Sequence, residues 1–132
     1  VLLVDPCAPS NAAEIGFVAG LALHEAAGAV TGAGFPALSL KWPNDLLVHG
    51  AKTAGLLLEG RALRGGGFAL VAGFGVNVGA KWDGAPYATA TLRDLEPDID
   101  RDKLFAALTA AWTGRLAAWR RGGLAPVLRA WS

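Results

Sequence analysis

KWPNDLLVHGAKTAGLLLE, residues 41–59, is the stretch of the sequence that decides the fold. It contains a lysine next to an aromatic residue, a Pro-Asn turn with an aspartate, a short alternating strand, a His-Gly turn and a second apolar strand. Two strands joined by so short a turn pair antiparallel as a β-hairpin. The stretch therefore predicts a hairpin with a cation, Lys41, fixed beside the turn at its mouth, an arrangement suited to an anionic ligand.

Outward from this hairpin, apolar alternation predicts further strands at residues 1–4, 38–42 and 68–78. Helices are predicted from Asn11 to about Gly28, with Asn11 and Glu14 forming a capping box, and over 101–121, capped by Asp98 or Asp100. The order of these elements predicts a single α+β domain over residues 1–132, with a mixed, mostly antiparallel sheet packed against helices.

Composition limits the classes of function. Just over half of the 132 residues are apolar, which predicts a compact globule. The formal net charge of +1 offers no electrostatic footprint for nucleic acid, and no unbroken apolar run approaches the roughly 20 residues that cross a bilayer. The single cysteine, Cys7, forms no internal disulfide, which fits a reducing cytoplasm.

The strand at 68–78 has two unlike faces. Alternation puts bulky side chains on one face, whereas the other carries Gly73 and Gly75 and ends in the amide of Asn77. Glycine weakens a strand interior, so two glycines on one face indicate a close approach by another group. That group is either a ligand or a packed helix, and the pattern alone does not decide between them.

The polar residues of the hairpin also have two interpretations. Lys41 either binds an anion or pairs with Asp45 or Glu59 at the surface. Asn44 and Asp45 suit a turn, and they either position Lys41 or contact a ligand themselves. No cluster of residues has metal-ligand spacing, so no protein-held metal site is predicted.

Four strings carry a resemblance to a known family. Residues 41–45 (KWPND) and 52–57 (KTAGLL) closely resemble the signature of biotin protein ligases, at the same separation. Residues 73–77 (GFGVN) resemble that family's Gly-x-Gly-Ile/Val-Asn segment, and residues 89–92 are a looser match. The resemblance implies a class II synthetase-like biotin/lipoate ligase core.

The resemblance also implies a reaction. Such enzymes couple biotin to ATP as biotinyl-5′-adenylate, with Mg²⁺ accompanying the nucleotide, and then transfer biotin to a lysine of a biotin carboxyl carrier domain. It implies a catalytic Lys41 that touches the biotin carboxylate and the α-phosphate. The residues implied to bind biotin or the adenylate are Lys41, Asn44, Asp45, Gly55, Leu56, Gly73, Gly75 and Asn77. It leaves open whether the protein is a homodimer.

Two features of the family have no match. Its Gly-Arg-Gly-rich loop normally precedes the segment that starts at Val1, and a small β-barrel usually follows the last helix. We therefore expect a partial catalytic core that is weak or inactive alone. The alternatives are a lipoate- or octanoate-type acyl-protein ligase, a non-catalytic biotin-sensing module of the same fold, and an anion site unrelated to biotin.

Overall fold

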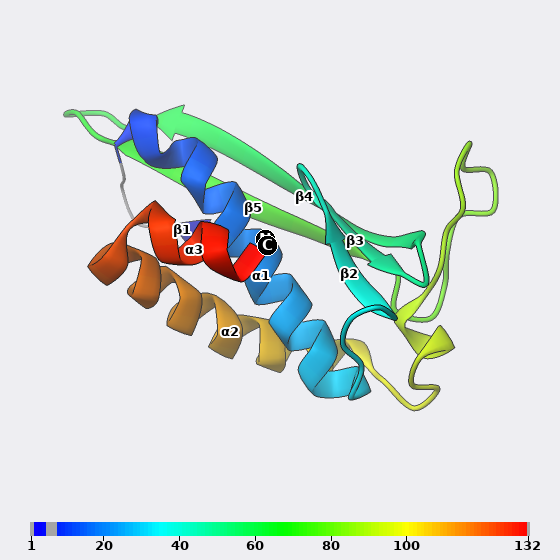
Figure 1. Ribbon diagram of the computed structural model, residues 1–132. Coiled ribbons are helices and arrows are strands. Elements are labelled where there is room, and N and C mark those ends of the chain that lie inside the picture. The colour runs from blue at the N-terminus through cyan, green and yellow to red at the C-terminus, as the bar shows by residue number, and fades with distance from the viewer. Residues whose placement is uncertain (1, 5–7, 132) are drawn as a thin grey trace.

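The protein contains one antiparallel sheet, seen in the computed structural model, which describes residues 2–4 and 8–131 (Figure 1). The five strands are β1 (Leu2–Val4), β2 (Leu38–Lys41), β3 (Asp45–Val48), β4 (Ala51–Ala62) and β5 (Phe68–Val76). Their order is β1-β5-β4-β3-β2, and every neighbouring pair is antiparallel. An isolated bridge between Lys52 and Thr89 is parallel. The predicted α+β class is confirmed.

Helices cover one face of this sheet (Figure 1). They are α1 (Ala12–Thr31), α2 (Arg101–Gly122) and α3 (Leu124–Trp131), and two short 3₁₀ turns, η1 (Pro9–Asn11) and η2 (Leu92–Asp94), lie in the connections. The core forms between α1, α2 and the facing side chains of the strands. Its largest fully buried side chains are Ile15, Val18, Leu23, Leu38, Leu46, Val48, Thr53 and Leu92.

Helix α1 is apolar because it lies inside the fold. By length and hydropathy the stretch Pro9–Thr31 is long and apolar enough to cross a membrane, with a mean hydropathy of 1.3, and half of it is buried in the protein. Polar residues such as Glu14 and His24 interrupt the stretch, so it contains no unbroken apolar run of that length. Contacts with the sheet and with α2 account for its composition.

The two long helices begin differently. Asn11 was predicted to cap α1, but its side chain accepts no capping hydrogen bond, because Pro9–Asn11 already form a 3₁₀ turn and Asn11 itself is helical. The predicted capping partner, Glu14, instead accepts a 2.7 Å hydrogen bond from Nε1 of Trp119 on α2. The cap of α2 is confirmed at Asp100, whose Oδ1 accepts a 2.7 Å hydrogen bond from the backbone N–H of Lys103.

Candidate ligand-binding site

The face of the sheet opposite the helices is open where the glycines lie. On β5, Leu70 and Ala72 point into the core, so Gly73 and Gly75 face the other way. A Cβ built on Gly75 would meet nothing nearer than the carbonyl oxygen of Gly55, at 3.9 Å. The interpretation of these glycines as a seat for a packed helix was therefore wrong. Together with Gly55 they form a surface without side chains. We call this surface, made by Gly55, Gly73 and Gly75, the glycine floor.

One row across the sheet joins the hairpin to this floor. Lys41 lies opposite Asp45, Asp45 opposite Gly55, and Gly55 opposite Gly75. Directly opposed residues of an antiparallel sheet project to the same face. The register therefore places a cation and a carboxylate of the hairpin on the same face as the glycine floor.

A second lysine reaches the floor through a β-bulge. The pairing of β3 with β4 shifts between Leu46 and Leu47, so that Leu46 faces Ala54, Leu47 faces Lys52, and Thr53 has no partner. A bulge adds one residue to a strand and re-aims its neighbours. Thr53 is fully buried, whereas the Lys52 side chain lies on the glycine side.

Lys52 is held in place by an ion pair. Its Nζ lies 2.7 Å from Oδ1 of Asp45, and it lies 5.4 Å from the centroid of the Tyr87 ring. The side chains of Lys52 and Asp45 retain only 32% and 19% of their exposure, so the pair is partly shielded from water. Such a carboxylate balances the ammonium and fixes its position on the face where a ligand would lie.

A loop, which we call the roof loop, borders this region. Residues 79–89, which project beside the hairpin in Figure 1, follow β5 and contribute Trp82 and Tyr87. Together with Gly55 and Gly75 they line an open cavity of about 130 Å³, which we call the floor cavity. Its lining residues are Lys52, Thr53, Ala54, Gly55, Gly75, Asn77, Trp82, Ala85, Tyr87 and Thr89. Backbone hydrogen bonds of 2.9 Å join Lys52 to Ala88 and Ala90, which anchors the loop to the strand that carries the amine.

The two asparagines implied as ligand contacts each donate a side-chain hydrogen bond within the protein. Asn44 Nδ2 donates a 2.8 Å hydrogen bond to the Leu56 carbonyl, and the Leu56 N–H donates to the Asn44 carbonyl at 2.9 Å. Asn77 Nδ2 donates to the Ala90 carbonyl at 3.2 Å. Asn44 therefore fixes the turn against β4, and Asn77 fixes the roof loop at the rim of the floor cavity.

The Leu56 side chain does not lie on the glycine side of the sheet. It is 7% exposed and packs into the core beneath α1. The next residue, Leu57, lies opposite Gly73 and is 62% exposed on the glycine side. Leu56 was predicted to bind biotin or the adenylate; alternation puts the side chain of Leu57, rather than that of Leu56, on the same face as Gly55.

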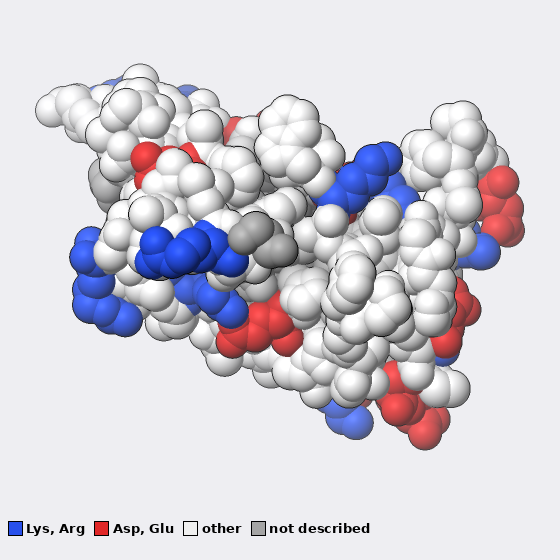
Figure 2. Space-filling view, viewed as in Figure 1, with Lys and Arg blue, Asp and Glu red and all other residues white. Residues whose placement is uncertain are grey.

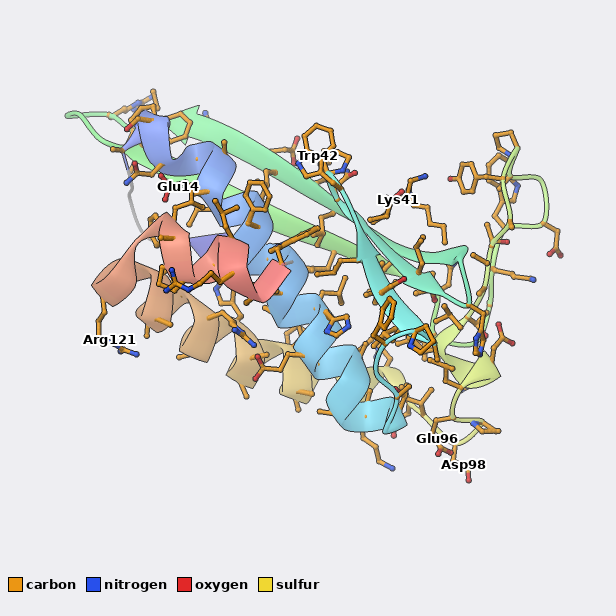
Figure 3. All side chains as sticks on the ribbon, viewed as in Figure 1. Glu14, Lys41, Trp42, Glu96, Asp98 and Arg121 are labelled. Carbon is orange, nitrogen blue, oxygen red and sulfur yellow. The ribbon has the colours of Figure 1, made fainter. Side chains whose placement is uncertain are left out.

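Lys41 and Lys52 occupy different places. Lys41 is exposed and, in Figure 3, extends from the end of β2 toward the roof loop. It lines a separate hollow, not the floor cavity. Sequence reasoning missed Lys52, although the string KTAGLL begins with it. The bulge at Thr53 reverses the face that simple alternation assigns to Lys52.

Within residues 2–4 and 8–131, no group of three or more His, Cys, Asp or Glu side chains is placed to hold a metal ion. His24 Nε2 lies 3.3 Å from the Leu38 carbonyl, under the sheet. His49 lies in the turn between β3 and β4 with φ of 48°. Neither histidine lines the floor cavity.

Solved structures identify the class of fold. Biotin protein ligase from Aquifex aeolicus superposes with a TM-score of 0.74 at 24% identity, covering 93% of this chain and 53% of that one. The Leishmania major biotin protein ligase in complex with biotinyl-5-AMP gives 0.69 at 17% identity, covering 89% and 53%. Lipoate-bound LipL1 from P. falciparum is more distant, at 0.55 and 15% identity, covering 88% and 33%. The fold is that of biotin and lipoate ligase catalytic domains.

Sequence narrows this class. The chain is 37% identical over 131 residues to biotin–acetyl-CoA-carboxylase ligase of Paracoccus denitrificans, covering 91% of this chain and 52% of the relative. It is 29% identical over 126 residues to the bifunctional ligase/repressor BirA of Escherichia coli K12, covering 93% and 38%. No family model matches it. In sequence and in fold the chain is similar to biotin protein ligases, and it spans about half the length of these curated relatives or less.

Proposed function

We propose that this chain is the adenylate-forming core of an ATP-dependent biotin protein ligase. Biotin and ATP would form biotinyl-5′-adenylate and pyrophosphate, and biotin would then pass to a lysine of a biotin carboxyl carrier domain. The observation that carries the proposal is the Lys52–Asp45 ion pair, which holds an ammonium over the bare floor at Gly55. The similarity to biotin–acetyl-CoA-carboxylase ligase supports the choice of substrate.

The chemistry requires a fixed positive charge between two anions. An oxygen of the biotin carboxylate bonds to the α-phosphorus of ATP while the bond from that phosphorus to the bridging oxygen breaks, and pyrophosphate leaves. Lys52 suits this role because Asp45 already orients its ammonium, so little reorganisation accompanies the reaction. We assign to Lys52 the contact with carboxylate and α-phosphate that the sequence assigned to Lys41.

The glycine floor suits the acyl chain of biotin. Gly55 and Gly75 lie opposite each other, and Gly73 lies opposite the exposed Leu57. A slender apolar chain gains contact with backbone and with Leu57 there, in a space that larger side chains would fill. The nucleotide would extend from Lys52 under the roof loop, with Mg²⁺ held by phosphate oxygens and water, because no cluster of acidic side chains among the described residues fits a metal.

The protein partner and the cellular compartment rest on the resemblance and on the sequence, without support from the geometry of the site. The protein partner would be the carrier domain of a biotin-dependent carboxylase, and the compartment would be the cytoplasm. The absence of nucleic-acid and membrane binding remains a prediction from the sequence, and the sequence leaves open whether the protein is a homodimer.

The test is exchange of labelled pyrophosphate into ATP by this chain, with biotin or lipoate added separately. The expected result is exchange that requires biotin, at a low rate because the catalytic core is expected to be partial. Exchange with lipoate alone would favour the acyl-protein ligase that the distant fold likeness allows. Saturable biotin binding without exchange would favour a non-catalytic sensing module, and the lack of both would contradict the proposal.

A further inference from the structure

One long face of helix α2 is uncovered. In Figure 1 this helix forms the lower border of the molecule, and its main neighbours, α1 and α3, lie on its other side. The uncovered face, which we call the outer face of α2, carries the exposed residues Asp102, Phe105, Ala106, Thr109, Thr113 and Arg120. We propose that it binds the same face of a second copy of the chain, with the two α2 helices antiparallel.

The middle of the outer face can be buried at little cost. Residues 104–114 contain no charged side chain, and Phe105 is 56% exposed. The hydroxyls of Thr109 and Thr113 each donate a 2.9 Å hydrogen bond to the helix, to the carbonyls of Phe105 and Thr109. Both hydroxyls therefore have partners inside the helix. A second protein surface could cover this face without leaving a buried polar group unpaired.

The two ends of α2 carry opposite charge. Residues 93–103 hold five acidic and three basic side chains, whereas residues 115–131 hold four arginines and no acid. One of those arginines, Arg115, pairs with Glu25 of α1 at 2.7 Å. Figure 2 shows basic side chains gathered where α2 meets α3, and Figure 3 labels Arg121 at that end and Glu96 and Asp98 near the other. The helix is therefore complementary in charge to an antiparallel copy of itself.

The spacing of Asp102 and Arg120 fits such a pairing. They are 18 residues apart, which is about five complete turns, so both lie on one line along the helix. A twofold axis at the midpoint sets Asp102 of each copy opposite the partner's Arg120, and Thr109 opposite the partner's Thr113. Both copies then use the same patch, as a twofold interface requires. Parallel helices would instead set each residue opposite its own copy, with like charges together.

Asp102 also has a neighbour in its own chain. Nε of Arg101 lies 3.3 Å from Oδ1 of Asp102, but these side chains are 86% and 87% exposed. An ion pair so exposed contributes little, so Asp102 can turn to another cation at small cost. Arg101 itself points about 100° around the helix from Asp102, away from the line that the partner would meet.

The expected dimer is weak and leaves the glycine floor accessible. A single pair of helices buries less than the roughly 1,200–2,000 Å² of a standard interface, so we expect a dissociation constant on the order of 100 µM. The charges would select the antiparallel orientation more than they would add affinity. Because α2 covers the face of the sheet opposite the glycine floor, this inference does not depend on the proposed function.

The experiment is sedimentation equilibrium of the intact chain from about 10 µM to about 1 mM at low ionic strength. The average mass should rise from 13.5 kDa toward twice that value. We expect Asp102→Arg, which sets two guanidinium groups against each other at each end, to weaken dimerisation at least about tenfold. Asp102→Arg combined with Arg120→Asp exchanges the two charges and should restore the affinity to within about threefold.

Asp83→Arg is the matched control, because it makes the same change of charge on the exposed roof loop and should leave dimerisation unchanged. Circular dichroism of each variant checks that the helices remain folded. A mass of 13.5 kDa at every concentration would overturn the proposal. So would a dimer that Asp102→Arg leaves intact, since another surface would then form it. Loss without recovery in the double variant would refute the antiparallel arrangement, and growth beyond a dimer would refute the twofold.

Discussion

Lys52 lies directly on Gly55. A Cβ built on Gly55 would stand 3.4 Å from Cε and 3.5 Å from Nζ of Lys52, in ordinary van der Waals contact. The lysine lies against the strand at Gly55, within reach of Asp45 at 2.7 Å. The ion pair with Asp45 therefore fixes the ammonium over the glycine, and a side chain longer than a methyl group at position 55 would compete for that place.

Replacing Lys52 tests the amine itself. Lys52→Met keeps the length of the side chain and removes the charge, and we expect biotin-dependent exchange to fall by about 10²–10³, the usual loss for one preorganised donor. Circular dichroism should show an unchanged fold. A Lys52→Met protein with near-normal exchange would refute the assignment.

The carboxylate of Asp45 should affect the exchange reaction by holding the ammonium of Lys52 in place. Asp45→Asn keeps the shape of the side chain and removes the ion pair, so we expect exchange to fall about tenfold as the amine loses its fixed position. Asp102→Asn is the matched control, since the Asp102–Arg101 pair is exposed at 87% and 86% and lies on α2. If both variants exchanged equally well, the ion pair would have no role in positioning.

The glycine floor can be tested by filling it. Gly75→Val adds a side chain on an open face, so we expect the fold to survive and biotin affinity to fall at least about tenfold, equivalent to about 1.4 kcal/mol. Gly114→Ala on α2, which also meets no neighbour, should stabilise the helix by about 0.5–1 kcal/mol and leave biotin affinity unchanged. Unaltered affinity in Gly75→Val would show that ligand does not lie there.

The hydrogen bond that joins α1 and α2 should contribute to the free energy of unfolding. Trp119→Phe removes the hydrogen bond from Nε1 to the Glu14 carboxylate, and we expect the free energy of unfolding to fall by about 1–2 kcal/mol. Trp82→Phe changes a loop side chain that is 68% exposed and should leave this free energy within about 0.5 kcal/mol. Urea denaturation measures both, and equal midpoints would contradict the role given to Trp119.

Much of this architecture followed from local pattern. The string at 41–59 predicted the hairpin because turn residues and alternation agree there, and the two faces of β5 followed from the same period of two. The bulge at Thr53 did not follow, since nothing in the strand's composition marks the unpaired residue. That single irregularity decides that Lys52 lies on the same face of the sheet as the glycine floor.

The hydrogen-bond partners of individual side chains were harder to predict than the positions of helices and strands. Glu14 suits a helix cap by spacing, yet a tryptophan 105 residues away takes its carboxylate. Asn77 was predicted as a ligand contact, and it lines the floor cavity while its Nδ2 donates a hydrogen bond to the Ala90 carbonyl. Each outcome depends on chain segments that meet only in the folded protein.

The parallel bridge between Lys52 and Thr89 has a mechanical consequence. The loop is fastened to the same peptide groups that carry the amine, so moving the loop away would first break the hydrogen bonds of Lys52 with Ala88 and Ala90. Gly75 and Leu57 are exposed on the open face of the sheet, so a ligand can reach that face while the loop keeps its place.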